Sequence, residues 1–243
     1  MSPLVISSLA IIGFSALIHA SFQLSVSVLT LLSGHSLGKK TAHRKLLGLM
    51  HSFVGGAFIM TTLLVSSATY YLGLAINHAA HTEQCIAAIT CGLMAGLGVA
   101  TWVFYYRRGD GTALWLPRNF AGVLSRRSRA TRNSAEAFGL GLTSVAAELL
   151  FIIGPVLASA LAVITLPSLP WQLAGIGLYI LVSLMPLLIV VALVGSGHSI
   201  AQLQQWRVRH KRFMQFAAGA SLIILAGFIF ADRVLGITTY GGF

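Results

Sequence analysis

The basic residues of this chain are confined to short segments that alternate with long apolar stretches. The sequence contains 16 Lys and Arg residues, and all of them except Arg233 fall within residues 39–45, 107–132 and 207–212. Basic residues that flank transmembrane helices are retained on the cytoplasmic side of a membrane. If the apolar stretches form six helices, these segments occupy the first, third and fifth connections. The sequence therefore predicts that all three segments face the cytoplasm.

The composition is that of an integral membrane protein. The chain is 56% hydrophobic and 9% charged, with a mean hydropathy of +0.85, whereas about 25% of the residues in a soluble domain are charged. A transmembrane helix needs about 20 apolar residues. We expect an all-α polytopic membrane protein in which residues 1–243 form a single transmembrane domain. Its six predicted spans are residues 4–32, 46–76, 85–106, 135–165, 172–195 and 213–231.

The ends and connections of these spans predict an orientation. No basic residue precedes the first apolar run, which favours an uncleaved first helix with its N-terminus outside. The connection at residues 77–84 contains Glu83 and no Lys or Arg, as expected for an outer loop. We therefore predict an integral protein of a bacterial inner membrane with both termini outside. The net charge of +11 then reflects this orientation and attraction to anionic lipid headgroups, and we expect no nucleic-acid partner.

The longest connection, residues 107–133, predicts a basic cytoplasmic loop with some structure of its own. Pro117 can begin a short helix, which would place Phe120, Val123 and Leu124 on one face. Such a helix fits the membrane interface. It fits equally well against the ends of neighbouring helices, and the sequence leaves both alternatives open.

Two ionisable residues stand out because they lie near the middle of predicted spans. Glu148 is the only one of the five acidic residues in such a position, and His19 lies near the middle of the first span, with Gln23 one turn later on the same face. Ionisable groups inside a membrane are costly and usually face the bundle interior or a water-filled pathway. One hypothesis makes His19 and Glu148 a midplane pair that exchanges a proton or ion. The alternative is that both only form hydrogen bonds between helices, with Glu148 protonated.

Helix-breaking residues occur in the same region of the sequence. Gly154 and Pro155 lie two turns beyond Glu148, and Pro186 lies near the middle of the fifth span. Proline removes a backbone donor and displaces the carbonyl four residues earlier, so the carbonyls of Phe151 and Val182 could bind a cation or a polar substrate. A kink that serves packing alone is the alternative.

A short motif recurs after the first and fifth spans. Ser-Gly-His-Ser occurs at residues 33–36 and again at residues 196–199, and both copies are expected at the cytoplasmic face. One hypothesis assigns His35 and His198 to a cytoplasmic gate. We favour helix-end capping, with glycine supplying a left-handed exit from each helix.

The cysteines indicate packing. Cys85 and Cys91 lie six residues apart on one predicted helix, which separates them by roughly 9 Å along its axis. That separation is too large for a disulfide between them. The pattern Gly92-x3-Gly96 beside them predicts close packing of the third span against another helix.

No sequence motif predicts a cofactor, a metal site or an enzyme. His78 and His81 lie near Glu83 in a predicted outer loop, but three possible ligands in a short solvated loop are a weak signal for a metal. Phosphate-binding loops, dinucleotide fingerprints, nucleophile elbows and zinc-protease motifs are absent from the sequence.

The layout resembles the lysine-exporter superfamily of small membrane transporters, which includes the cytochrome c biogenesis thiol-disulfide carriers. The resemblance lies in residues 29–34, 152–157 and 219–227. It implies two inverted three-helix halves, whose equivalent first and fourth spans meet near the midplane. The thiol-disulfide carriers place a cysteine in the first span and another just before the Gly-Pro of the fourth. Here position 152 is Ile and the first span has no cysteine, so the resemblance does not imply redox activity.

These features together predict a transporter. We expect proton-coupled export of a small cation, metal ion or amino-acid-like solute, in which Glu148 titrates while His19 and Gln23 orient the substrate. A non-catalytic scaffold or accessory subunit that acts through the arginine-rich loop is one alternative. A thiol-disulfide electron carrier or membrane-embedded enzyme is another. The expected partners are the bilayer and the solute, with a second copy of the chain or a membrane partner protein left open.

Reporter fusions test the predicted orientation. A reporter that is active only in the cytoplasm should be active when fused within residues 39–45 or 107–133, because basic segments are retained there. The same reporter should be inactive within residues 77–84. Activity at residues 77–84 would contradict the orientation and the depth assigned to each polar residue.

Overall fold

A computed structural model of the chain describes residues 3–22, 24–33, 40–78, 82–104, 127–128, 131–197, 205–206 and 209–235. Helices account for nearly all of this described part, and it contains no strand. The elements are α1 (Pro3–Ser21), α2 (Leu24–Ser33), α3 (Lys40–His78), α4 (Thr82–Phe104), α6 (Ser134–Ile164), α7 (Leu169–Gly195), α9 (Lys211–Ile229) and the π-helix η1 (Phe230–Leu235).

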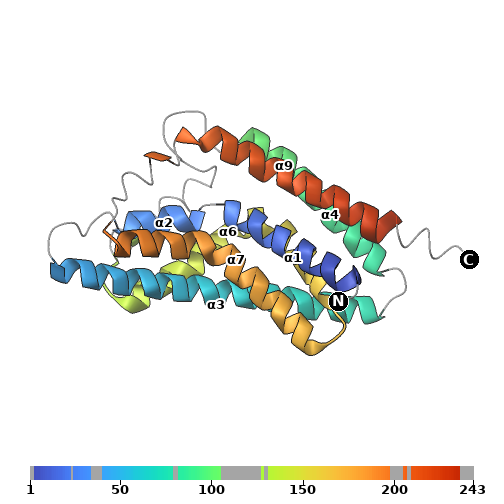
Figure 1. Ribbon diagram of the computed structural model, residues 1–243, viewed down its shortest axis with the longest axis horizontal. Helices are drawn as coiled ribbons and strands as arrows, with labels where there is room; N and C mark the ends of the chain where they lie inside the picture. Colours follow the sequence, from blue (N-terminus) through green and yellow to red (C-terminus); the bar gives the residue numbers. More distant parts are fainter. Residues whose placement is uncertain are drawn as a thin grey trace, which may run out of the picture.

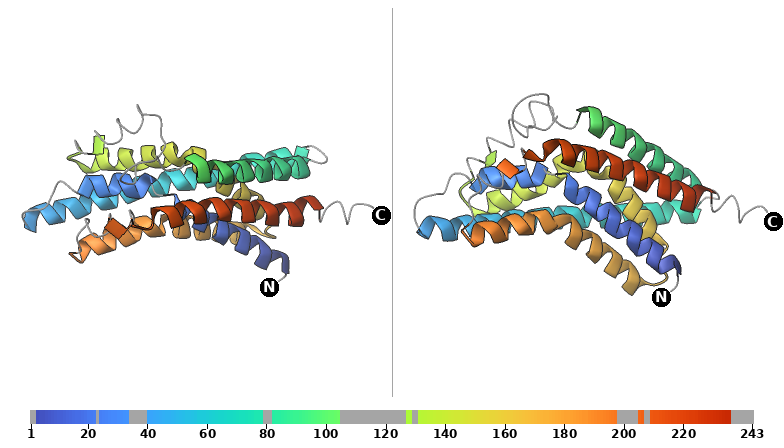
Figure 2. Two further views of the ribbon diagram at one scale, coloured as in Figure 1. Left: turned by 90° about the horizontal axis from the view of Figure 1, so that it is seen from above. Right: turned by 45° about the horizontal axis from the view of Figure 1, so that its top comes forward.

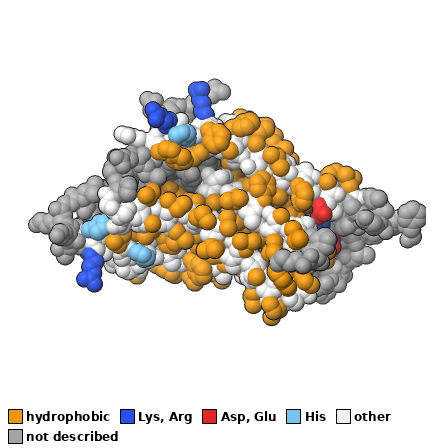
Figure 3. Space-filling view, viewed as in Figure 1, with side chains coloured by type: hydrophobic (Ala, Val, Ile, Leu, Met, Phe, Trp, Pro, Cys, Tyr) orange, Lys and Arg blue, Asp and Glu red, His pale blue; other side chains and the backbone are white. Residues whose placement is uncertain are grey.

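The described part of the chain has six helices that are long and apolar enough to cross a membrane. On the face shown in Figure 3, hydrophobic side chains cover the middle of the molecule, and most of the visible Lys and Arg side chains lie toward the end where α3 and α9 begin. Helix α3 has 39 residues and is about 58 Å long, so it extends beyond a hydrocarbon layer of about 30 Å. The chain is therefore an integral membrane protein, and the predicted all-α fold with six spans is confirmed.

The predicted first span, residues 4–32, is not one continuous helix and consists of α1 and α2. At the end of α1 the backbone N–H of Phe22 donates to the carbonyl of His19, 3.1 Å away, which tightens the last turn. The hydroxyl of Ser21 donates to the carbonyl of Ile18 at 2.6 Å, and serine hydroxyls that bond to nearby carbonyls compete with regular helix. Helix α2 starts again at Leu24, so the first span is interrupted in the interior of the bundle.

Helix α6 is the centre of the bundle, because α1, α2, α3, α4 and α7 all pack against it. Helices α4 and α9 lie side by side as a pair along one flank (Figures 1 and 2). The helix pairs in contact also follow a two-fold pattern between the two halves of the chain. The contact of α3 with α6 corresponds to that of α1 with α7, and the contact of α4 with α6 corresponds to that of α1 with α9.

Glycines set the closest approach between helices in this bundle. A Cβ on Gly56 of α3 would collide with the carbonyl oxygen of Phe138, and a Cβ on Gly141 of α6 would collide with that of Phe53. The two backbones therefore meet directly, as small residues permit in membranes.

Helix α4 packs closely against its partner, but not through the predicted glycines. A Cβ on Gly92 or Gly96 would meet no atom within 4 Å, so the predicted role of this pair was wrong. Gly98 fills that role instead, since a Cβ there would collide with the carbonyl oxygen of Gly219 on α9. Both cysteines of α4 are free, as their spacing predicted.

The α3–α6 contact predicts opposite effects of two alanine substitutions on α6. Gly141→Ala should lower the free energy of unfolding by about 1 kcal/mol or more, because the added methyl overpacks the interface. Gly139→Ala is the matched control, because a Cβ there meets nothing within 4 Å, and it should stabilise the helix by roughly 0.5–1 kcal/mol. Thermal unfolding in detergent measures both effects, and equal stability of the two variants would contradict the close contact.

Candidate functional site

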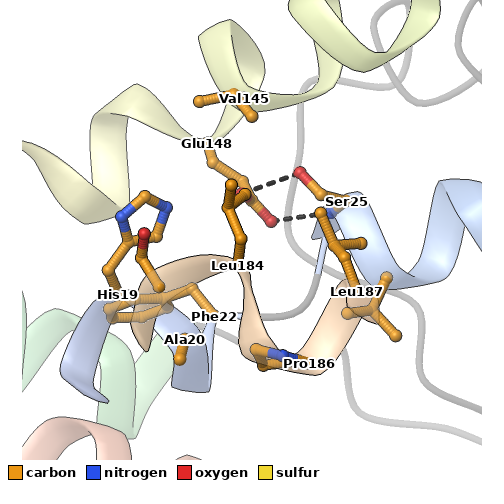
Figure 4. A pocket seen from close by; sticks show the side chains of 11 residues that line it. His19, Ala20, Phe22, Ser25, Val145, Glu148, Leu184, Pro186 and Leu187 are labelled. Atoms are coloured by element: carbon orange, nitrogen blue, oxygen red, sulfur yellow. Dashed lines mark hydrogen bonds between the residues drawn. The ribbon is translucent and has the colours of Figure 1, made fainter. Parts of the chain in front are cut away.

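Glu148 of α6 holds the break between α1 and α2. Its side chain is only 2% exposed. The backbone N–H of Ser25 donates to Oε1 at 2.7 Å and the Ser25 hydroxyl donates to Oε2 at 2.9 Å (Figure 4). Ser25 is the second residue of α2, where backbone N–H groups have no partner within the helix. Glu148 therefore caps α2 from another helix, and the positive end of the α2 dipole stabilises an ionised carboxylate there.

His19 connects the end of α1 to α7. Its side chain is 4% exposed, and its Nδ1 lies 2.9 Å from the hydroxyl of Tyr179, which is fully buried. The two rings lie 5.6 Å apart between centroids. Because Nδ1 is engaged with Tyr179, the orientation of the imidazole is set by α7.

A small cavity lies where α1, α2, α6 and α7 meet. Its volume is about 20 Å³, and its polar lining comes from His19, Ser25, Glu148 and Ser183. Figure 4 shows His19, Ser25 and Glu148 around this space. A buried water needs roughly 10–15 Å³ of such space and two to four polar partners. The cavity therefore has the size and polarity for one water molecule or one bare small cation.

The proline positions differ in what they contact. Pro186 lies within α7 and lines the cavity close to Ser183, and α7 bends near its middle (Figure 1). Pro155 is buried within α6. Gly154 packs against Met94 of α4, where a Cβ would collide with the Met94 side chain. Of these three residues, Pro186 is the one at the cavity, while Gly154 serves the contact with α4.

The structure places His19 and Glu148 at one cavity, an arrangement that the hypothesis of a midplane pair requires. The hydrogen bonds described above connect each of them to another helix, so they also meet the expectation of the purely structural alternative. Ser25, Tyr179 and Ser183 were missed by sequence reasoning. Ser25 lies 123 residues from Glu148, and Tyr179 lies 160 residues from His19, so no local pattern could pair them.

Several predicted site residues lie outside the described part of the chain. These are Gln23, His35 and His198 of the proposed pathway and gate, together with His81 of the outer loop. At the second copy of the Ser-Gly-His-Ser motif, Gly197 adopts φ 85°, a left-handed conformation. Its N–H donates to the carbonyl of Val194 at 3.1 Å. The capping that we favoured for this motif is therefore confirmed at Gly197.

Within the described residues, no group of three or more His, Cys, Asp or Glu side chains could hold a metal ion. Comparison with protein-family profiles, with curated proteins and with solved structures finds no match to this chain. The candidate site consequently depends on its own geometry, in which a buried carboxylate joins a helix break to a polar cavity.

The capping contact predicts how α2 responds to changes at Glu148. Glu148→Leu removes both acceptors, so backbone amides at the start of α2 should exchange with deuterium about five-fold faster, as expected for a lost N-cap worth about 1 kcal/mol. Glu148→Gln is the matched comparison, because its amide can accept from the Ser25 N–H and donate to the Ser25 hydroxyl but carries no charge, so its exchange should be faster than in the unmodified protein and slower than in Glu148→Leu. Hydrogen-exchange mass spectrometry of residues 24–33 measures the effect. Equal exchange in both variants would contradict the cap.

Proposed function

We propose that this protein is a secondary transporter that exchanges protons for a small cation, metal ion or amino-acid-like solute. The observation that carries the proposal is the buried Glu148 carboxylate beside a polar cavity at the start of a half-helix. Broken helices whose half-helix ends point at the bound species are typical of secondary transporters. Non-helical backbone at membrane depth is tolerated where it is buried in protein or lines a cavity.

Protonation of Glu148 provides a physical link between a proton and a change in conformation. The ionised carboxylate accepts hydrogen bonds from both donors of Ser25 and interacts favourably with the N-terminus of α2. A proton on Glu148 removes the negative charge and weakens this interaction. Because α2 also packs against α3 and α7, release of its N-terminus would loosen this side of the bundle. The proton would thereby alter access to the cavity.

The size of the cavity favours a small cation as the species bound in this conformation. About 20 Å³ is enough for one water or a bare ion, whereas an amino acid needs an expanded site. Carboxylate and hydroxyl oxygens are suitable ligands for hard cations, and Glu148, Ser25 and Ser183 supply them. His19, held by Tyr179, would orient the bound species from α1.

The packing pattern supports two inverted halves and, with them, membership of the lysine-exporter superfamily. Because each half contains three spans, an odd number, the second half starts on the opposite side of the membrane and is inverted relative to the first. When α1 and α2 are interchanged with α6, α3 with α7, and α4 with α9, most pairs of helices in contact become another pair that is also in contact. Under this proposal the protein lies in a bacterial inner membrane with both termini outside, and it exports its solute away from the basic end.

A proton-flux assay tests the proposal. Purified protein is placed in liposomes that contain a pH-sensitive dye, and Na⁺, Zn²⁺ or lysine is added outside. The unmodified protein should couple movement of at least one of these solutes to proton movement. Glu148→Gln should abolish the signal while the protein remains folded, because the amide cannot ionise.

Glu136→Gln provides the matched control, since Glu136 is an exposed carboxylate on the same helix, and it should leave the flux unchanged. A scaffold would give no coupled flux with any of the three solutes. That result, or an unchanged flux in the Glu148→Gln protein, would contradict the proposal.

A further inference from the structure

A charged network closes the end of the bundle opposite to the basic segments. Arg233 of η1 is 15% exposed at its side chain and pairs with Asp232 at 3.0 Å and with Glu83 of α4 at 3.4 Å. Its Nη2 also donates to the Thr165 hydroxyl at the end of α6, 3.0 Å away. One guanidinium faces two carboxylates, so this network carries a net charge of −1 when all three groups are ionised.

The network continues into the bundle along the interface between α1 and α6. The hydroxyls of Thr165 and Ser8 lie 3.0 Å apart, and Ser8 is fully buried on α1. A polar connection therefore extends from the surface at Arg233 to the first two turns of α1.

Two more hydroxyls, those of Ser15 on α1 and Ser159 on α6, lie further along the same two helices. Helices α1 and α2 run antiparallel to α6 in one register, as shown by the contacts Ser8–Thr165, Phe22–Phe151 and Ser25–Glu148. This register places residue 15 level with residue 158. Ser15 and Ser159 are therefore at the same depth. Ser15 also shares a helix face with Ser8 and with His19, one turn further along. Both hydroxyls thus lie between the Arg233 network and the Glu148 cavity.

Ser15 and Ser159 are each 0% exposed, and neither hydroxyl has a hydrogen-bond partner in the described part of the chain. A buried hydroxyl without a partner is costly. Buried polar groups of this kind are the groups that internal water molecules satisfy, each water making about three hydrogen bonds. Two such hydroxyls at one depth on facing helices indicate a place for water.

We propose that water bound by Ser15 and Ser159 connects the Arg233 network to the Glu148 cavity and that protons reach Glu148 by this route. The second half of this statement rests on the proposed function. Each water would accept one proton and pass one on, and the last would protonate a carboxylate oxygen of Glu148.

Electrostatics favours this end as the entrance for protons. The Arg233 network has a net negative charge, which raises the local concentration of cations. The opposite end exposes basic side chains with Glu136 as the only acid described there, and it repels cations. These basic residues are Arg44, Lys45, Arg127, Arg132, Arg209 and Arg212.

Thiol deuteration tests for the water directly, without any transport. Ser15→Cys and Ser159→Cys are each made in a protein that lacks Cys85 and Cys91, and infrared spectroscopy follows replacement of S–H by S–D after transfer to D₂O. The matched reference is the Cys91 thiol in a separate protein that lacks only Cys85. Cys91 is buried on α4 and lies nine residues from the start of that helix. Ser15 is at a greater depth from the same end, twelve residues from the start of α1.

Both introduced thiols should exchange on the order of ten-fold faster than Cys91, because a buried group without access to water exchanges only after local opening. Exchange at residues 15 and 159 as slow as at Cys91 would overturn the proposal. That conclusion would hold whatever Glu148→Gln does to transport.

The proton route is tested by flux in the liposome assay. Ser15→Ala and Ser159→Ala should each slow coupled proton flux about five-fold, as expected from one lost hydrogen bond worth about 1 kcal/mol. Thr90→Val is the matched control, because the Thr90 hydroxyl is also buried without a described partner but belongs to α4 and not to either of the two helices that carry the proposed route. Unchanged flux in both serine variants would overturn the route.

The two proposals fail in different ways. Fast thiol exchange together with full flux in the Glu148→Gln protein would leave the water in place and refute the proposed function. Loss of flux in Glu148→Gln with slow thiol exchange would support the transporter and refute the water route.

Discussion

The interruption of the first span is stabilised by Glu148, which supplies an acceptor to the backbone of α2. Inside a membrane no bulk water is present to satisfy free backbone N–H groups, so a helix break needs a partner from the protein. Glu148 meets this need at Ser25, whose backbone N–H and hydroxyl both donate to its carboxylate. The same carboxylate lines the cavity, so the group that stabilises the break is also the group to which the proposed function assigns the proton.

Close packing elsewhere keeps this site in register. Gly56 and Gly141 bring α3 directly against α6, which holds Glu148 opposite the start of α2. Phe22 and Phe151 stack at the break, with ring centroids 5.7 Å apart, and fix the crossing of α1 over α6. The flank formed by α4 and α9 has its own glycine contact at Gly98 and Gly219. The bundle thus combines a tightly packed frame with an interruption that, under the proposed function, responds to a single proton.

The distribution of charge gives the two ends of the molecule different properties. Exposed arginines gather at the end where α3, α6 and α9 begin. At the opposite end Arg233 is engaged by Glu83 and Asp232, so its charge is more than balanced. A cation that approaches the centre of the bundle therefore meets attraction at one end and repulsion at the other.

The sequence by itself determined the number of spans, because burial of about 20 apolar residues per helix is a local requirement that composition records directly. It also singled out His19 and Glu148, since ionisable residues are rare at such depth. Only the tertiary structure decided their partners, because Ser25 and Tyr179 lie more than a hundred residues away along the chain. It also decided where the first span breaks and which glycines touch, since Gly98 and not Gly92 or Gly96 meets a neighbour. Those outcomes depend on how whole helices cross, which no short segment encodes.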